Sequence, residues 1–199
     1  VLYQEFSFGR YFNQIAAGIL RGLVQTRQPQ RPLRILEVGG GTGGTTAWLL
    51  PELNGVPALE YHFTDISALF TRRAQQKFAD YGFVRYHELD LEKEAQSQGF
   101  QANSYDLIVA ANVIHATRHI GRTLDNLRPL LKPGGRLLMR EITQPMRLFD
   151  FVFGPLVLPL QDIDAREGEL FLTPQQWQQQ CRRAGFSKVA WLPQEGSPT

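Results

Sequence analysis

The fold is decided by one stretch of the chain, residues 34–44, which reads RILEVGGGTGG. Apolar residues that suit a short buried strand run directly into five glycines within six positions. A ligand at the carboxyl end of a strand needs a close approach of the backbone, which Cβ atoms would obstruct. A tight turn alone would need only one glycine. The stretch therefore predicts a strand, a ligand-binding turn and a helix in succession.

Predicted strands and helices alternate along the rest of the chain. Thr173-Pro174-Gln175-Gln176 is a capping-box pattern that begins the last helix. We expect strands at 33–38, 61–64, 84–89, 105–111, 136–142 and 189–192, and helices at 10–25, 45–53, 67–78, 120–131 and 173–184. This alternation implies an α/β, Rossmann-like fold, with a mostly parallel central sheet and helices on both faces.

Composition narrows the class of protein. The 199 residues, 43% hydrophobic and 20% charged, suit one globular core. Charges or prolines break every long apolar run, so we expect no membrane span and no secretory signal. A net charge of +2 without a basic, aromatic-interleaved run gives no reason to expect a nucleic-acid partner. The single cysteine, Cys181, excludes an intrachain disulfide and a thiolate metal cluster, and fits a cytoplasmic location.

The glycine pattern alone fits two classes of cofactor. Gly39, Gly41 and Gly44 also satisfy the G-x-G-x-x-G fingerprint of dinucleotide sites. Asp65 then lies about 20 residues further on, the spacing of the acid that binds a ribose. A nicotinamide-dependent reductase, however, would also need a catalytic pair such as Tyr-x-x-x-Lys, which the chain lacks.

Acidic residues at three strand ends favour S-adenosylmethionine (SAM). Glu37, Asp65 and Asp90 stand at or near the ends of the first three predicted strands. Such acids suit a ligand that carries an ammonium group, a ribose diol and an adenine, and they suit a pyrophosphate poorly. The segment after the fourth strand, 110–117, lies where cofactor and substrate would meet. The residues therefore favour SAM over a dinucleotide.

Five motifs, spread over roughly residues 3–192, carry a resemblance to a known family. They are the loop extended through Thr42-Gly43-Gly44-Thr45-Thr46, then Phe78-Ala79-Asp80-Tyr81, Phe83-Val84-Arg85-Tyr86, Asn112-Val113-Ile114-His115-Ala116-Thr117, and Lys132-Pro133-Gly134-Gly135 before a strand that ends in Glu141. Together they resemble the methyltransferase domains of modular polyketide synthases, which are class I SAM-dependent methyltransferases. The resemblance implies SAM as cofactor and S-adenosylhomocysteine (SAH) as product.

The resemblance also implies which residues form the site. It places the cofactor on Glu37, Gly39, Gly41, Gly43, Asp65, Ile66, Asp90, Leu91 and Asn112. It makes His115 the general base, and Glu141 the residue that fixes its tautomer and raises its basicity. His119 would share a helix face with His115 if the helix began early, but two histidines without a carboxylate set make a poor metal site. We therefore expect no metal.

The reaction stays open among three alternatives. The first is methylation of the α-carbon of a β-ketoacyl thioester tethered to an acyl carrier protein. The second is O-methylation of a β-hydroxyl or enol of the same chain, which would use the same base. The third is a non-catalytic SAM-binding or structural domain. In each case the expected partners are the carrier protein and neighbouring synthase domains, with no nucleic acid and no membrane.

Two features depart from the family. Only about 30 residues precede the first strand, so residues 1–32 are expected to be an N-terminal helix and linker, the remnant of a lid region. Residues 33–199 form the expected core, whose final antiparallel strand should be missing, which leaves 189–192 without a partner. Leu156–Asp162 stands where carbon-methylating members often carry a Trp-Trp pair, and this keeps O-methylation open. The apolar stretch 149–159 fits an acyl channel or ordinary core.

Overall fold

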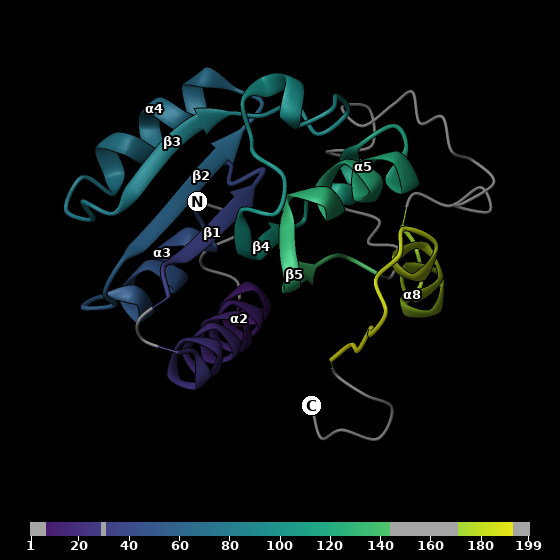
Figure 1. Cartoon of the computed structure of the whole chain (residues 1–199), viewed down its shortest axis with the longest axis horizontal. Coiled ribbons are helices and arrows are strands. Elements are labelled where there is room, and N and C mark those ends of the chain that lie inside the picture. The colour runs from purple at the N-terminus through teal and green to yellow at the C-terminus, as the bar shows by residue number, and fades with distance from the viewer. Residues whose placement is uncertain (1–6, 29–30, 144–170, 193–199) are drawn as a thin grey trace.

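Five parallel strands form the centre of the computed structural model, which describes residues 7–28, 31–143 and 171–192 (Figure 1). Their order in the sheet is β3-β2-β1-β4-β5. Their bounds are Leu33–Val38 for β1, Leu59–Asp65 for β2, Val84–Glu88 for β3, Tyr105–Ala111 for β4 and Leu131–Arg140 for β5. The order reverses between β1 and β4, and ligands of open α/β sheets bind beyond the carboxyl ends of strands at such a point. The predicted α/β, Rossmann-like fold is confirmed.

Helices cover both faces of this sheet (Figure 1). They are α2 (Ser7–Thr26), α3 (Thr46–Leu49), α4 (Ala68–Lys77), α5 (Ile120–Leu127) and α8 (Pro174–Arg183), with short 3-10 turns η1 (Leu50–Leu53), η2 (Gln96–Gln98), η3 (Ile114–Ala116) and η4 (Arg128–Leu130). Because side chains alternate along a strand, Ile35 packs with α2, α3 and α4 on one face. Its neighbour Leu36 packs on the other face with α5 and α8. The two hydrophobic cores therefore lie on opposite faces of the sheet.

The last helix begins as the capping-box pattern predicts. The backbone N–H of Gln176 donates to Thr173 Oγ1 at 3.2 Å, and the N–H of Thr173 donates to Gln176 Oε1 at 2.8 Å. Trp177 and Cys181 are buried in the core between this helix and the sheet.

The predicted start of the fifth strand is wrong. We expected a helix to Leu131 and a strand from Arg136, whereas the structure ends α5 at Leu127 and begins β5 at Leu131. Leu131 lies opposite Tyr105, and the next paired position on β5 is Arg136, opposite Leu107. The Pro-Gly-Gly turn therefore lies inside the strand as an irregularity, because pairing resumes on both sides of it.

The predicted strand at 189–192 is also wrong. The structure gives these residues no strand conformation, and Val189 packs against the core instead. A strand exists only through a hydrogen-bonded neighbour, and the described residues offer this segment none. The missing antiparallel partner itself stays a prediction. The segments 149–159 and Leu156–Asp162 lie outside the described residues.

The structure shows how α4 and α5 begin. Ser67 occupies the cap position of α4, but its side chain makes no capping hydrogen bond. The carboxylate of Asp65 accepts the Ser67 N–H instead, at 2.9 Å. His119 occupies the N-cap position of α5 without a side-chain capping hydrogen bond. Because α5 begins only at Ile120, His119 does not share a helix face with His115 in η3. Within the described ranges, no helix combines the length and the apolar character needed to cross a bilayer.

Candidate functional site

The glycine loop after β1 is shaped by close packing and by left-handed backbone. Gly39, Gly41 and Gly43 have φ angles of 60°, 54° and 71°, which residues with side chains rarely adopt. A Cβ on Gly39 would lie 2.2 Å from Val113 Cγ2. A Cβ on Gly41 would meet no described atom closer than 4.0 Å, so this glycine presents bare backbone to open space. The loop therefore has room for a ligand at Gly41.

Glu37 lies under this loop in a fully buried position, with 1% of its surface exposed. Its Oε2 accepts hydrogen bonds from Thr46 Oγ1 and from the hydroxyl of Tyr61, both at 2.8 Å. Burial raises the pKa of the Glu37 carboxyl to about 7, although the two hydrogen bonds lower it in part. The charge on this group therefore responds to its surroundings near neutral pH.

Asp65 closes the loop from the end of β2. Its Oδ2 accepts the N–H of Gly41 and its Oδ1 accepts the N–H of Ser67, each at 2.9 Å. Only 7% of Asp65 is exposed, whereas the next side chain, Ile66, is 67% exposed. An apolar side chain left so open beside an ordered carboxylate is suited to contact a ligand ring.

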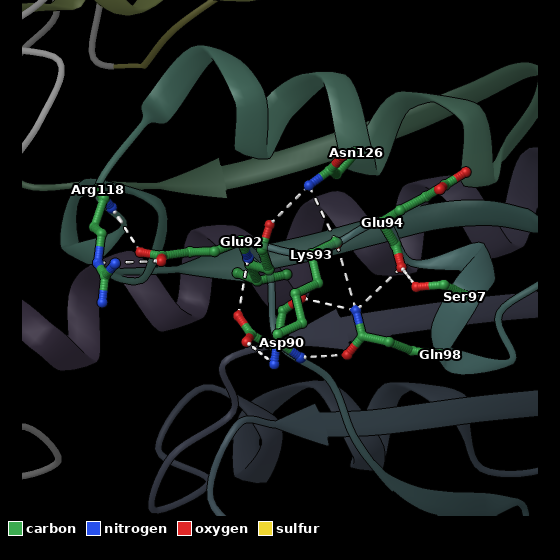
Figure 2. A network of polar contacts seen from close by, with 9 residues as sticks. Asp90, Glu92, Lys93, Glu94, Ser97, Gln98, Arg118 and Asn126 are labelled. Carbon is green, nitrogen blue, oxygen red and sulfur yellow. Dashed lines mark hydrogen bonds and ion pairs between the residues drawn. The ribbon is translucent and has the colours of Figure 1, made fainter.

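Asp90 follows β3, and its loop is tightly hydrogen-bonded (Figure 2). Its Oδ1 accepts the N–H of Glu92 and its Oδ2 pairs with Lys93, both at 3.0 Å. The side-chain amide of Gln98 bonds the N–H and the C=O of Asp90, at 2.8 and 2.9 Å. Leu91, predicted to contact cofactor, directs its side chain into the core and is 8% exposed.

The same loop is held to the elements that follow β4, as Figure 2 shows. Asn126 on α5 donates to the carbonyls of Leu91 and Lys93, both at 3.1 Å. Glu92 Oε1 accepts the N–H of Arg118 at 2.8 Å. A polar pocket of about 400 Å³ adjoins these contacts, lined by Asp90, Glu92, Lys93, Arg118, His119, Arg122 and Thr123. A pocket of this volume can hold part of a small-molecule ligand.

His115 and Glu141 meet although they are far apart in the sequence. His115 lies in η3, just after β4, and is 2% exposed, and Glu141 directly follows β5. Nδ1 of His115 lies 2.5 Å from Glu141 Oε2. The other oxygen, Oε1, accepts the N–H groups of Val113 and Ile114 at 3.2 and 2.8 Å. The ring of Phe171 packs 5.3 Å from the imidazole, measured between centroids.

This geometry assigns chemistry to the imidazole. The carboxylate of Glu141 accepts a hydrogen bond, so the imidazole proton belongs on Nδ1 and the lone pair on Nε2. A buried imidazole oriented in this way can accept a proton at Nε2. Within the parts of the chain that the structure describes, no cluster of three histidine, cysteine or acidic residues could hold a metal ion.

Asn112 is bonded within the protein, through Arg140. Its backbone has a φ of 52°, and its N–H donates to the Arg140 carbonyl at 2.6 Å. With the amide oriented to satisfy both groups, Arg140 Nη2 donates to Asn112 Oδ1 at 2.8 Å. Nη1 of Arg140 donates to Asn13 Oδ1 at 2.9 Å, and Thr45 Oγ1 donates to the same oxygen at 3.1 Å. Sequence reasoning missed Asn13, Thr45 and Arg140 as residues of this site.

Two sequence signals point to these residues. Arg140 directly precedes Glu141 at a strand end, and Asn13 is an amide on the otherwise apolar face of α2. All the predicted site residues lie at the carboxyl edge of the sheet, either at the ends of β1 and β2 or in the loops that follow the five strands. The structure therefore groups the predicted cofactor residues and the predicted catalytic pair at one edge.

Comparison with known proteins places this geometry among methyltransferases. Residues 36–137 match a family model described as "Methyltransferase domain". The methyltransferase calH of Penicillium decumbens is 43% identical over 161 residues, which cover 77% of this chain and 43% of that protein. The highly reducing polyketide synthase gloL of Glarea lozoyensis is 42% identical over 161 residues, 78% of this chain and 6% of the synthase.

Solved structures agree with these relatives. The CurJ carbon methyltransferase superposes with a TM-score of 0.91 at 41% identity, covering 97% of this chain and 52% of that one. The trans-methyltransferase CalH, solved in complex with SAH, superposes with a TM-score of 0.76 at 39% identity, covering 88% and 51%. The chain thus spans about half the length of these two structures and a small part of the synthases.

Proposed function

The chain belongs to the family of methyltransferase domains, and we propose that it is a SAM-dependent methyltransferase that acts on a polyketide intermediate. The single observation that carries this proposal is the His115–Glu141 pair, buried at the same sheet edge as the glycine loop. An acid–base pair beside a ligand loop, at the switch point of the sheet, is what such a transferase needs.

The residues at the strand ends fit SAM. The bare backbone at Gly41 leaves room for the methionine part, and Asp65 offers a carboxylate for the ribose diol. The exposed side chain of Ile66 is suited to contact the adenine ring. Asp90 is proposed to lie beside the same ring. The remaining proposed contacts are Gly39, Gly43, Leu91 and Asn112. When bound, the cofactor supplies a methyl group activated by a sulfonium.

Glu37 contributes charge beneath the glycine loop. Its pKa of about 7 means that an approaching ammonium group would readily favour the ionised form. The cationic amino-acid part of the cofactor would therefore find a carboxylate that becomes charged as it binds. This role suits a buried acid better than the recognition of a phosphate.

His115 is proposed as the base for the acyl substrate. With its Nδ1 proton held by Glu141, Nε2 takes the proton from the α-carbon of a β-ketoacyl thioester, which two flanking carbonyls acidify. Glu141 stabilises the imidazolium that forms. Carbon methylation is favoured because the similar CurJ and DszA structures are described as carbon methyltransferases.

The carrier protein and the neighbouring synthase domains belong to the same proposal. The curated relatives include highly reducing and non-reducing polyketide synthases, in which this chain would occupy 6–8% of the length. Under the proposal, residues 1–32 are the part of a lid region that adjoins the core. The cytoplasmic location stays a prediction.

The test is a methylation assay on defined thioesters. The protein is incubated with carbon-13 methyl-labelled SAM and with acetoacetyl or 3-hydroxybutyryl carrier protein, and the products are analysed by mass spectrometry and NMR. We expect a labelled methyl group on the α-carbon of the acetoacetyl product. Methylation of the hydroxy thioester alone would show an O-methyltransferase, and SAH binding without any product would show a non-catalytic domain.

A further inference from the structure

One buried side chain on α2 joins the two halves of the site. Asn13 is 2% exposed, and its Oδ1 accepts hydrogen bonds from Thr45 Oγ1 at 3.1 Å and from Arg140 Nη1 at 2.9 Å. Thr45 directly follows the glycine loop, and Arg140 is the last residue of β5. A single amide oxygen therefore connects the N-terminal helix, the loop proposed to hold SAM and the end of β5, directly before Glu141.

Arg140 continues these contacts into the catalytic turn. Its guanidinium and its carbonyl both bond Asn112, which has left-handed backbone. The adjacent Glu141 accepts from the next two N–H groups and holds His115. Arg140 and Glu141 thus bond four consecutive residues, 112–115, of which Asn112 has a backbone conformation that residues with side chains seldom adopt.

An amide at position 13 is not explained by packing. The neighbouring inward residues Ala16 and Leu20 are apolar and buried, whereas Asn13 faces the Thr45 hydroxyl and the Arg140 guanidinium. Burying an amide is unfavourable unless its polar atoms are bonded, and here the bonds made by Oδ1 run to the cofactor side and to the catalytic side.

We propose that Asn13 is a positioning residue, which sets the distance between the SAM loop and His115 through Thr45 and Arg140. This inference rests on the proposed function and deepens it. It gives the N-terminal helix a role in the reaction, because a displacement of the base by about 1 Å can lower a rate by about 100-fold.

The test compares four variants of the protein, three at positions 13 and 14 and one at Thr45. Asn13→Leu keeps the size and removes the acceptor, Asn13→Asp keeps the acceptor, and Gln14→Leu changes an exposed amide one position along the same helix. For each we measure kcat and KM for SAM with acetoacetyl carrier protein, the thermal midpoint, and hydrogen exchange of the amides of residues 112–114.

We expect Asn13→Leu to lower kcat by about 10- to 100-fold with little change in the KM for SAM, and to speed exchange at 112–114. Asn13→Asp should restore both to within about threefold, and Gln14→Leu should leave both unchanged. Thr45→Val removes only the link to the loop, so it should lower kcat while exchange at 112–114 stays slow. If Asn13→Leu does not fold, the kcat of Thr45→Val tests the proposal by itself.

Two results would overturn the inference. One is Asn13→Leu with either the parent kcat or the parent exchange pattern, and the other is Thr45→Val with the parent kcat. Hydrogen exchange does not depend on turnover. An inactive parent protein would therefore contradict the proposed function, whereas unchanged exchange in Asn13→Leu would contradict the positioning role.

Discussion

Glu141→Gln is the substitution whose effect the structure defines most sharply. Glu141 Oε1 accepts two backbone N–H groups, from Val113 and Ile114, and Oε2 faces Nδ1 of His115. A glutamine has one oxygen and one NH₂ group in place of the two oxygens. The two backbone donors require the oxygen, so the NH₂ group is left facing the imidazole.

The consequence is a change of tautomer. An NH₂ group opposite Nδ1 needs a lone pair there, so the imidazole proton moves to Nε2, the atom that should accept the substrate proton. The corresponding aspartate-to-asparagine change in a Ser-His-Asp triad lowers kcat by about 10⁴-fold for this reason. We expect Glu141→Gln to lower kcat by about 10²–10⁴-fold, which corresponds to about 3–5 kcal/mol of barrier.

The assay is the initial rate of methyl transfer to acetoacetyl carrier protein, with SAH affinity measured by calorimetry. Glu60→Gln is the matched control, because Glu60 is a half-exposed carboxylate paired with Arg34 near the start of β2, and surface pairs of this kind contribute little. Turnover of Glu141→Gln within about threefold of the parent, with unchanged SAH affinity, would refute this reasoning.

Three further predictions concern the cofactor side. Asp65→Ala leaves the Gly41 N–H without its acceptor and should weaken SAM by about 1.5–3 kcal/mol in calorimetry, so an unchanged affinity would exclude Asp65 as a cofactor residue. Glu37, with its pKa raised from 4.5 to about 7, binds more protons folded than unfolded, so the free energy of unfolding should fall by about 3 kcal/mol as pH rises from 4.5 through 7. Glu37→Gln should flatten this slope in urea titrations of the ligand-free protein, and an identical slope would contradict the assignment. Gly39→Ala brings a Cβ within 2.2 Å of Val113 at a φ of 60° and should cost about 1–3 kcal/mol, and an unchanged thermal midpoint would argue against this strain.

Local pattern was enough to predict the order of the elements. The glycine loop, the strand-end acids and the capping box at Thr173 each depend on residues close together in the chain, and each is found where the sequence predicts it. A parallel sheet then brings the ends of β1, β2, β3, β4 and β5 to one edge. The family resemblance implied the pair of His115 and Glu141, and the neighbouring ends of β4 and β5 bring the two residues together.

Long-range pairing was not predictable in the same way. A strand at 189–192 fits the local composition, but a strand needs a neighbour, and that depends on the whole sheet. The contact of Asn13 with Arg140 spans 127 positions, and no spacing rule encodes it. The partners of Glu37, a threonine and a tyrosine, are likewise set by packing around the strand end.

The measurement that tests the account most directly is the turnover of His115→Ala together with its affinity for SAM. The proposed cofactor contacts lie mainly at the ends of β1, β2 and β3, so the variant should bind SAM as the parent does. Its kcat should fall by about 10²–10⁴-fold, the effect of removing a positioned base. In the double variant with Glu141→Gln the rate should be little lower, because the two residues act as one unit. Near-parent turnover by a folded His115→Ala protein with parent SAM affinity would contradict the account.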